Sequence, residues 1–445
     1  MRCIAICAAI SQSHVLTATP AQNADAPSDA PTVITLPQAI DRARGNDPNV
    51  AAAGADAKAT ALDRSISHAA LLPNAVYHNQ YLFTQGTGGK GTVLAGSTQT
   101  SAPIFIANNA VHEYTSQAAV TETMGLKSVA DVRLADATAA RAAAEYEIAR
   151  RGLVATVVVL YYNLTASEHK VAVAQRASNE AAGFTDLTSK RDAAREVAHA
   201  DVVKAQLQQQ QRERDLADAK LAAGKARLEL GVLLFADPRT DYATQAASLG
   251  AMPSRADVEA QAAAHNPELR SALAAVHMND AEVLGARAAY MPDLALNFNY
   301  GIDAAQFAAK GPNGVNNLGY SASATVDIPV WDWLATQHRV KQTEIRRDAA
   351  RVALTATQRH LIAALDEAYA EAAEAQRQAA SLDLSARTAT ESLRLTKLRY
   401  SAGEATVLEV VDAQTSLTAA ENAREDGVVR YETGLANLQV LTGTL

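Results

Sequence analysis

The stretch Arg399-Tyr-Ser-Ala-Gly403-Glu-Ala-Thr-Val-Leu-Glu409-Val-Val-Asp412-Ala-Gln414 decides the fold of this chain. It holds one glycine and no proline, and long Ala- and Leu-rich polar segments run into it and out of it. Beyond the glycine, apolar residues recur at spacings of 3, 4 and 3, which is a helical period: Val410, Ala413, Leu417 and Ala420. The stretch therefore predicts a tight turn between two long antiparallel helices.

A weaker copy of this motif lies upstream, at residues 191–206. At a constant offset of 208, seven of its sixteen positions are identical to those of 399–414: Arg191, Ala194, Glu196, Val202, Val203, Ala205 and Gln206. Proline spacing supports the same conclusion, because Pro48 and Pro73 lie 25 residues apart, as do Pro267 and Pro292. We therefore predict an internal duplication, which sets the architecture of the whole chain.

The duplication divides the chain into predicted segments. Residues 1–26 have the features of an export signal peptide, with a short apolar core from Cys3 to Ile10 and a small-x-small cleavage site at Ala24-Asp25-Ala26. The first repeat is predicted at 27–235, a linker at 236–253 and the second repeat at 254–445. Each repeat is expected to contain a helix, two strands, a long helix, a turn and a second long helix.

Composition excludes several classes of protein. The net charge is −8 and there is no basic block, so nothing points to nucleic-acid binding. Hydrophobic residues make up 48% of the chain but aromatic residues only 5%, which suits long helices packed through small side chains. The only cysteines are Cys3 and Cys7, so the body of the chain has neither a disulfide nor a thiolate metal site.

Four segments have strand periodicity, at about 74–84, 113–123, 293–302 and 318–328. Leu296, Phe298 and Tyr300 alternate with polar or small residues, which gives one apolar and one polar face over about 10 residues, the length of a tilted membrane strand. Trp331 and Trp333 follow the last strand, where anchors at a membrane interface are expected. The alternative is a soluble hairpin with one buried face.

No run approaches the roughly 18 apolar residues of a membrane-spanning helix, so a membrane crossing would have to use these strands. Four strands cannot close a barrel with a lumen, and lipid does not tolerate open strand edges, so membrane strands would force oligomerisation. The strands lead into proline-free helical stretches at about 126–190 and 333–400, each roughly 100 Å long if unbroken. The returning helices are predicted at about 197–234 and 406–441.

In this order and spacing, the residues resemble the TolC-like outer-membrane efflux protein family, the outer membrane factors. The resemblance covers about 34–445, and its most specific part is Tyr400-x-x-Gly403 followed by Val410-Val411-Asp412-Ala413. The other signatures are Leu36-x-x-Ala39-Ile40 with Asp47-Pro48, the strand entries Leu72-Pro73 and Met291-Pro292, Ile328-Pro329-Val330-Trp331-Asp332, and the ending Gly443-Thr444-Leu445.

The resemblance implies a mainly α fold with a membrane β-barrel portion. Each protomer would contribute four strands to one 12-stranded barrel of a homotrimer, and the helical hairpins would continue that barrel as a periplasmic tube. Such a protein is the outer-membrane exit duct of a tripartite efflux or type I secretion system, and it conducts substrates passively. Its implied partners are a periplasmic adaptor (membrane fusion) protein, an inner-membrane pump and outer-membrane lipid, and the adaptor would dock at the turns 192–198 and 401–406, near Arg195, Glu196, Gly403 and Glu404.

Two carboxylates are candidates for the channel gate. Glu409 and Asp412 are three residues apart and therefore share one helix face beside the turn. They match the acidic residues that line the narrowest part of the channel in the family, where threefold symmetry would make six carboxylates that attract polyvalent cations. The alternative is a solvated helix face, which such charged pairs commonly form.

The family also closes its entrance with a latch, in which a tyrosine and an arginine near the second turn pair with an aspartate near the first. Tyr400 and Asp201 match this pattern, but the arginine position is Ala405. The first turn also has Arg195 where the family usually has glycine. The resemblance therefore implies either no latch or one built from other cations, such as Arg195 or Lys204.

Signals for catalysis or cofactors are absent from the sequence. The histidines are scattered without metal-binding spacing, and we find no Gly-x-Ser-x-Gly motif. The glycine-rich segment 86–92 is not a phosphate loop, because residue 84 is Thr and Gly91 follows Lys90. We expect no enzyme, no cofactor and no metal site. The alternative to a channel is a soluble periplasmic coiled-coil scaffold or adaptor; a simple porin would leave about half of the chain without a role.

Overall fold

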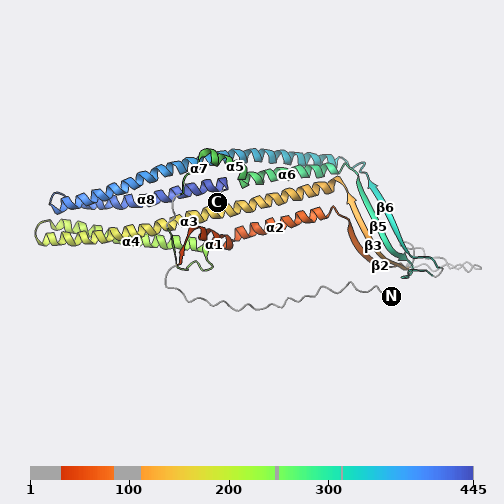
Figure 1. Cartoon of the computed structure of the whole chain (residues 1–445), viewed down its shortest axis with the longest axis horizontal. Helices are drawn as coiled ribbons and strands as arrows, with labels where there is room; N and C mark the ends of the chain where they lie inside the picture. The colour runs from red at the N-terminus through yellow and green to blue at the C-terminus, as the bar shows by residue number, and fades with distance from the viewer. Residues whose placement is uncertain (1–31, 85–111, 246–249, 312–313, 444–445) are drawn as a thin grey trace, which may run out of the picture.

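The computed structural model describes residues 32–84, 112–245, 250–311 and 314–443. The predicted export signal at 1–26 lies outside these residues. The described chain is long and narrow, with helices along most of its length, strands at one end and two helix turns at the other (Figure 1).

The same series of elements occurs twice. The first copy is α1 (Leu36–Asn46), α2 (Pro48–Ala69), β2 (Asn74–Phe83), β3 (His112–Met124), α3 (Leu126–Ala193) and α4 (His199–Leu234). The second copy is α5 (Arg255–His265), α6 (Pro267–Ala288), β5 (Asp293–Ala304), β6 (Leu318–Asp327), α7 (Ala335–Ser401) and α8 (Val407–Thr442). The matching helices have nearly equal lengths: 11 residues in α1 and α5, 22 in α2 and α6, 68 and 67 in α3 and α7, and 36 in α4 and α8.

Local signals in the sequence set the helix ends. The Asp47 carboxylate accepts from the backbone N–H of Val50 at 2.8 Å, and Pro48 opens α2 at the position where a missing N–H costs nothing. In the second copy, the Asn266 side chain accepts from Leu269 at 2.9 Å and Pro267 opens α6. Pro48 and Pro267 therefore begin equivalent helices in the two copies.

The four long strands form one antiparallel sheet in the order β2-β3-β5-β6. Cross-strand neighbours share a face, so Val120, Phe298 and Ala322 form one row across three strands. Phe298, Tyr300 and Tyr320 on this face are exposed, whereas Asn297 and Asn299 on the opposite face are half-buried. The apolar face therefore points outward, as the alternating pattern predicted. β2 pairs only with β3 and β6 only with β5, so the outer edge of each of these two strands is unpaired among the described residues.

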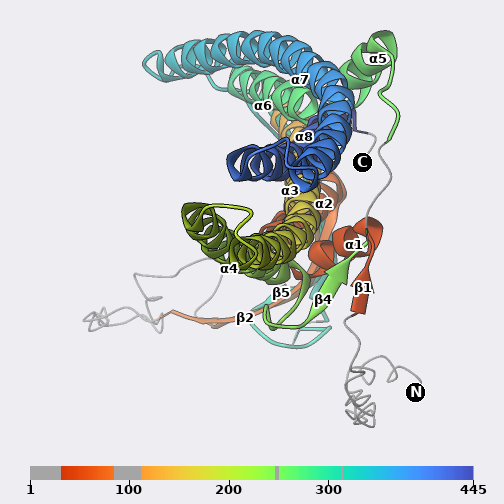
Figure 2. The same ribbon diagram turned by 90° about the vertical axis from the view of Figure 1, so that its left-hand side faces the viewer.

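The long helices pack closely because their interfaces are built from small residues. A Cβ placed on Gly434 of α8 would lie 3.2 Å from the Cα of Ala372 in α7, so the two helices approach too closely there for a larger residue. α3 contacts α4 and α6, and it also packs along α8, the last helix of the second copy (Figures 1 and 2). The packing of α3 on α6 and α8, together with the pairing of β3 with β5, joins the two halves of the chain into one body.

A short parallel strand pair was not predicted. β1 (Thr32–Ile34) pairs with β4 (Tyr242–Thr244), which falls inside the segment that the sequence analysis treated as a linker. The Tyr161 hydroxyl holds this pair against α3, because its oxygen lies 2.9 Å from the Ile34 carbonyl and 2.7 Å from the Gln245 carbonyl, which share its one proton, and it accepts from Gln245 N–H at 3.1 Å. Strands of three residues are too short to show a periodicity, which is why the sequence pattern missed them.

One buried arginine ties three helices together at the middle of the molecule. Arg151 of α3 donates to the carbonyl of His265 at the end of α5 and to that of Val440 near the end of α8, at 3.2 and 3.4 Å. Glu147 accepts from its Nε at 2.7 Å. A cation suits this place because helix C-termini carry unpaired carbonyls and partial negative charge.

Among the described residues, no helix is both long enough and apolar enough to span a membrane. The chain changes from β6 to α7 through Trp331 and Trp333, whose rings contact edge to face with centroids 6.0 Å apart and are 65% and 84% exposed. Trp333 and Leu334 have φ angles of 57° and 65°, in the left-handed region. The Asp332 side chain accepts from the backbone N–H of Thr336 at 2.7 Å and starts α7.

Candidate channel entrance at the helix-turn tips

The two helix turns have the same backbone conformation. In the first, Glu196 N–H donates to the Arg191 carbonyl at 2.8 Å; in the second, Glu404 N–H donates to the Arg399 carbonyl at 2.9 Å. Both turns place one residue in the left-handed region: Arg195 with φ 63° and Gly403 with φ 79°. This is the pattern of a helix that ends in a Schellman motif. Arg195 therefore occupies a position where glycine is preferred, in agreement with the alignment of the two copies.

Glu409 has a structural role beside any role in a channel. Its carboxylate accepts from the backbone N–H of Thr406 at 3.1 Å, and the Thr406 hydroxyl accepts from Glu409 N–H at 3.3 Å, which forms a capping box at the start of α8. Arg399 also donates to it at 3.3 Å. The hydrogen bond from the Thr406 backbone, and then those from Thr406 Oγ1 and Arg399, hold the pKa of Glu409 below its usual value.

Asp412 has a different environment. It lies one helical turn beyond Glu409 and is exposed, and it makes no hydrogen bond or ion pair with the rest of the described chain. The two carboxylates thus lie near one another on α8, but only Asp412 is free of structural contacts. Their placement in a lumen remains a prediction.

Tyr400 is buried between the two hairpins and not exposed at the tip. Its ring packs edge to face against Phe184 of α3, with centroids 5.1 Å apart, and against Ala205, Val407 and Val410. Its hydroxyl lies 3.4 Å from Thr188 Oγ1. Thr188 is a residue of α3 and Tyr400 is a residue of α7, so this contact links the first hairpin directly to the second.

Within the described chain, the two residues matched to the family latch do not meet. The Asp201 carboxylate lies 3.8 Å from Lys204 Nζ, one turn along its own helix, whereas the Tyr400 hydroxyl is directed to Thr188. The cation that does contact Tyr400 is Arg191, a residue that the sequence analysis used only as evidence for the repeat. Its Nη1 donates to the Tyr400 carbonyl at 2.8 Å. The sequence feature that could have pointed to Arg191 as a functional residue is its identity with Arg399 in the two aligned turns.

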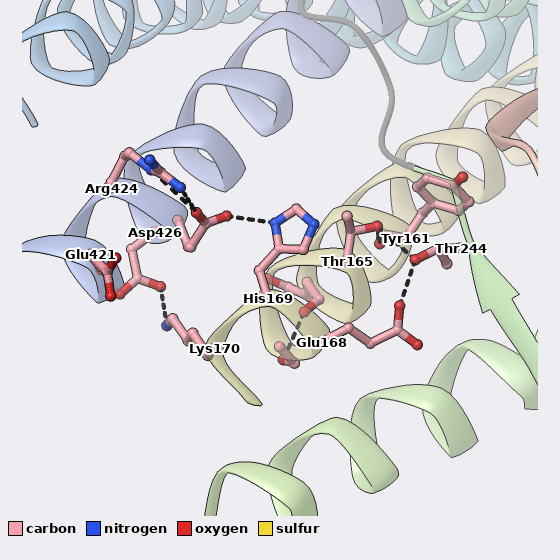
Figure 3. A network of polar contacts seen from close by, with 12 residues as sticks. Tyr161, Thr165, Glu168, His169, Lys170, Thr244, Glu421, Arg424 and Asp426 are labelled. Carbon is pink, nitrogen blue, oxygen red and sulfur yellow. Dashed lines mark hydrogen bonds and ion pairs between the residues drawn. The ribbon is translucent and has the colours of Figure 1, made fainter. Parts of the chain in front are cut away.

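Further from the tips, polar contacts connect α3 with α8 (Figure 3). His169 Nδ1 lies 2.8 Å from Glu425 Oε2, and Arg424 donates to the other oxygen of Glu425 at 2.8 Å. Lys170 forms an ion pair with Asp426, and Arg176 pairs with Glu421 at 3.0 Å. Glu425 is buried, and burial alone would raise its pKa, but the hydrogen bonds from Arg424 and His169 outweigh burial and lower it.

A second buried carboxylate on the interface between α3 and α8 has fewer hydrogen-bond partners than Glu425. Glu432 of α8 is 5% exposed, and its Oε1 has no hydrogen-bond partner among the described residues. Burial raises its pKa more than the hydrogen bond from Tyr162 lowers it. Glu432 and Glu425 are seven residues apart on α8, as are Tyr162 and His169 on α3, so the contacts follow a coiled-coil repeat in two antiparallel helices.

The described side chains do not meet the requirements of a metal centre. In the part of the chain that the structure describes, no three His, Cys, Asp or Glu side chains lie where they could hold a metal ion. At the tips, the two helical hairpins meet through the contacts of Tyr400 with Phe184 and Arg191.

Comparisons with known proteins agree with this geometry. Residues 259–444 match the family model described as outer membrane efflux protein. A 172-residue segment is 26% identical to outer membrane protein OprJ of Pseudomonas aeruginosa, and it covers 39% of this chain and 36% of OprJ, so the match spans little more than a third of that relative. Cobalt-zinc-cadmium resistance protein CzcC of Cupriavidus metallidurans is 23% identical over 398 residues, which cover 88% of this chain and 85% of CzcC.

The fold also matches solved structures over nearly the whole chain. The CmeC outer membrane channel of Campylobacter jejuni superposes with a TM-score of 0.75 over 92% of this chain and 85% of CmeC, at 16% sequence identity. The predicted fold class, a mainly helical protein with two long helical hairpins and two β-hairpins in each protomer, is therefore confirmed.

Proposed function

We propose that this chain, which belongs to the outer membrane efflux protein family, is the outer-membrane exit duct of a tripartite efflux or type I secretion system. The family model lies in the second copy of the repeat, and the fold of an outer-membrane channel extends over both copies. The duct lies in the outer membrane through its strands and extends into the periplasm through its helices. It passively conducts substrates that a pump and an adaptor deliver.

One observation carries this proposal: the sheet exposes its apolar face, and the outer edges of β2 and β6 are unpaired in the described chain. An exposed apolar face belongs in lipid, but unpaired backbone N–H and C=O groups at a strand edge do not. Pairing β6 of one protomer with β2 of the next satisfies both edges. Three protomers then make a barrel of twelve strands, and their helical hairpins continue it as a tube.

The helix turns are the gated entrance of this duct. The tips at 192–198 and 401–406, with Arg195, Glu196, Gly403 and Glu404, form the surface that docks the adaptor. Glu409 and Asp412 face the lumen above the second turn, where three copies place six carboxylates around the axis. Tyr400 holds the two hairpins together just beside them, and Trp331 and Trp333 anchor the barrel at the membrane interface.

The charges on the strands favour cationic cargo. In the described strands β2, β3, β5 and β6 there is no Lys or Arg, whereas four carboxylates lie on the polar face: Glu113, Asp293, Asp303 and Asp327. Asp293 and Asp327 are direct cross-strand partners on the polar face. A pathway lined by one sign of charge concentrates counter-ions and repels ions of the same sign. We therefore expect a channel that prefers cations.

The alternative is a soluble periplasmic scaffold or adaptor. A scaffold would not need a sheet with an exposed apolar face, because it has no lipid to contact. A single cell-fractionation experiment separates the two functions. A channel is recovered in outer membranes and needs detergent for extraction, whereas a scaffold is released by osmotic shock.

The direct test is conductance of the purified full-length protein in a planar lipid bilayer. We expect stepwise currents with a higher permeability for potassium than for chloride, and chemical cross-linking in detergent that ends at a trimer. Recovery of a stable, water-soluble monomer, or of membranes without added conductance, would overturn the proposal.

A further inference from the structure

Two arginines occupy the same position in the two copies of the repeat but make different contacts. Arg399 donates to the Glu404 carbonyl at 3.1 Å and to Glu409 at 3.3 Å, so it stabilises its own turn and the start of its own hairpin. Arg191 also binds its own turn, through the Glu196 carboxylate at 3.0 Å. Unlike Arg399, it then reaches the other hairpin.

The contact of Arg191 with the other hairpin has two parts. Its Nη1 donates to the backbone carbonyl of Tyr400 at 2.8 Å, and its guanidinium carbon lies 5.0 Å from the centroid of the Tyr400 ring. Tyr400 is 3% exposed, and its ring is held from the other side by Phe184. The acceptor is therefore in a fixed position, and it lies 209 residues from the donor in the sequence.

The chemistry of this contact requires an arginine. The Tyr400 carbonyl belongs to the last turn of α7, where carbonyls are short of intrahelical partners and the helix carries partial negative charge. A guanidinium can bind this carbonyl with one nitrogen, the Glu196 carboxylate with another, and stack its plane on an aromatic ring. A lysine ammonium keeps the charge but cannot make these three contacts together.

We propose that Arg191 is the latch residue of the entrance, which holds the α7–α8 tip closed against the α3–α4 tip within each protomer. The inference rests on the proposed channel function. Moving the second hairpin outward separates Arg191 from both the carbonyl and the ring of Tyr400, while the contacts of Arg399 move with their own hairpin and remain intact. Arg191 is a positioning residue, since it acts on the pore through the location of Tyr400.

The test compares single-channel records of the wild type with those of two variants and a matched control. Arg191→Gln removes the positive charge and the stacking on the Tyr400 ring. Arg191→Lys keeps the positive charge but lacks the planar guanidinium with its several N–H donors. The control is Arg394→Gln, an exposed arginine in the same last turns of α7 that pairs only with Glu391 of its own helix. Cross-linked trimer yield and thermal unfolding of each protein show whether the barrel and the tube have assembled.

We expect the ratio of open to closed time to rise about tenfold or more in Arg191→Gln, the change that follows from losing a charge-assisted hydrogen bond. Arg191→Lys should lie between Arg191→Gln and the wild type, and Arg394→Gln should gate like the wild type. If Arg191→Gln does not assemble, the comparison of Arg191→Lys with Arg394→Gln decides the question.

Wild-type gating in an assembled Arg191 variant would overturn the latch while leaving the channel function in place. An equal rise in the ratio of open to closed time in Arg394→Gln would also overturn the latch, because a general loosening of the tips would then explain the effect. A wild-type protein that carries no current would overturn the channel function and the latch together.

Discussion

His169 of α3 and Glu425 of α8 meet across the interface between the two hairpins, with 2.8 Å between Nδ1 and Oε2. Glu425 is buried and also accepts from Arg424, so its carboxylate neutralises a local positive charge at the interface between two helices (Figure 3). The acceptor is buried while His169 and Arg424 are partly exposed, so removing the carboxylate charge weakens two charge-assisted hydrogen bonds at a buried oxygen pair, which costs more than the loss of a surface ion pair.

We therefore predict that Glu425→Gln lowers the free energy of unfolding by about 1–3 kcal/mol at pH 7. Because the folded state lowers the pKa of Glu425, its stabilising contribution is complete above the ordinary value of 4.5 and is lost as the pH falls through the lower folded value. Thermal unfolding in detergent between pH 3 and pH 8 measures this difference. The control is Glu374→Gln, whose carboxylate pairs with Arg377 on its own helix, and an equal effect of the two substitutions would contradict the prediction.

We predict that Glu432→Gln has the opposite effect and raises the free energy of unfolding. Burial raises the pKa of Glu432, so the folded state binds the proton more tightly than the unfolded state does. The charged carboxylate of Glu432 therefore destabilises the folded protein. This destabilisation is complete above the pKa that Glu432 has in the folded state, and it disappears as the pH falls below the ordinary value of 4.5. We expect Glu432→Gln to stabilise the protein by about 1 kcal/mol at pH 8 and by less at pH 5. A variant that is less stable than the wild type at pH 8 would show that Glu432 is well solvated in the assembled protein.

Asp412→Asn is the cleanest test of the predicted carboxylate ring. Asp412 makes no contact that holds the described fold, whereas Glu409 caps α8, so only the first substitution changes charge without loosening the helix start. Trivalent cations bind tightly where several carboxylates converge, so we expect block by such a cation to need roughly tenfold more of it in Asp412→Asn, and still more in the double variant Glu409→Gln/Asp412→Asn.

Titration of bilayer current with a trivalent cation measures this block. Glu391→Gln, which removes a carboxylate paired with Arg394 within α7, is the control and should be blocked like the wild type. Unchanged block in Asp412→Asn would place that residue outside the lumen.

The two turns allow a matched experiment on backbone strain. Gly403 and Arg195 have φ angles of 79° and 63° at the same position of the same turn, and a side chain there costs about 1 kcal/mol. Gly403→Ala should therefore destabilise the protein by about 1 kcal/mol, whereas Arg195→Gly should be neutral or slightly stabilising, since relief of strain offsets the flexibility of glycine. Thermal unfolding of the two variants checks both signs. Equal destabilisation by both would mean that the Arg195 side chain makes a stabilising contact that outweighs its strain.

Much of the fold could be predicted from the sequence because local signals determine it. The prolines at 48 and 267 begin helices, the glycine at 403 and its counterpart Arg195 end them, and the alternation around Phe298 marks a strand with one apolar face. Each of these signals acts through backbone hydrogen bonds and dihedral angles within a few residues. Because the chain is duplicated, the secondary structure assigned to the clearer copy could also be assigned to the weaker copy.

The contacts at the entrance were less accessible to the same reasoning. The sequence placed Glu409, Asp412 and Tyr400 beside the second turn, but it could not show that Glu409 is also a helix cap or that Tyr400 is buried against Phe184. It did not single out Arg191 for the gate, because nothing in the sequence distinguishes Arg191 from Arg399. The two differ only in what lies beside them in space.

By itself, the sequence determined a twice-used unit with two outward-facing apolar strands and two long helices joined by a tight turn. Only the tertiary structure decided which residues join the two units, namely Arg191 with Tyr400 and His169 with Glu425. It alone also showed that the short strand β1 pairs with β4. The physical reason is that helix period and turn geometry are local properties of the chain. The pairing of two helices depends instead on how their faces align after some 200 intervening residues have folded, as the separation of 209 residues between Arg191 and Tyr400 illustrates.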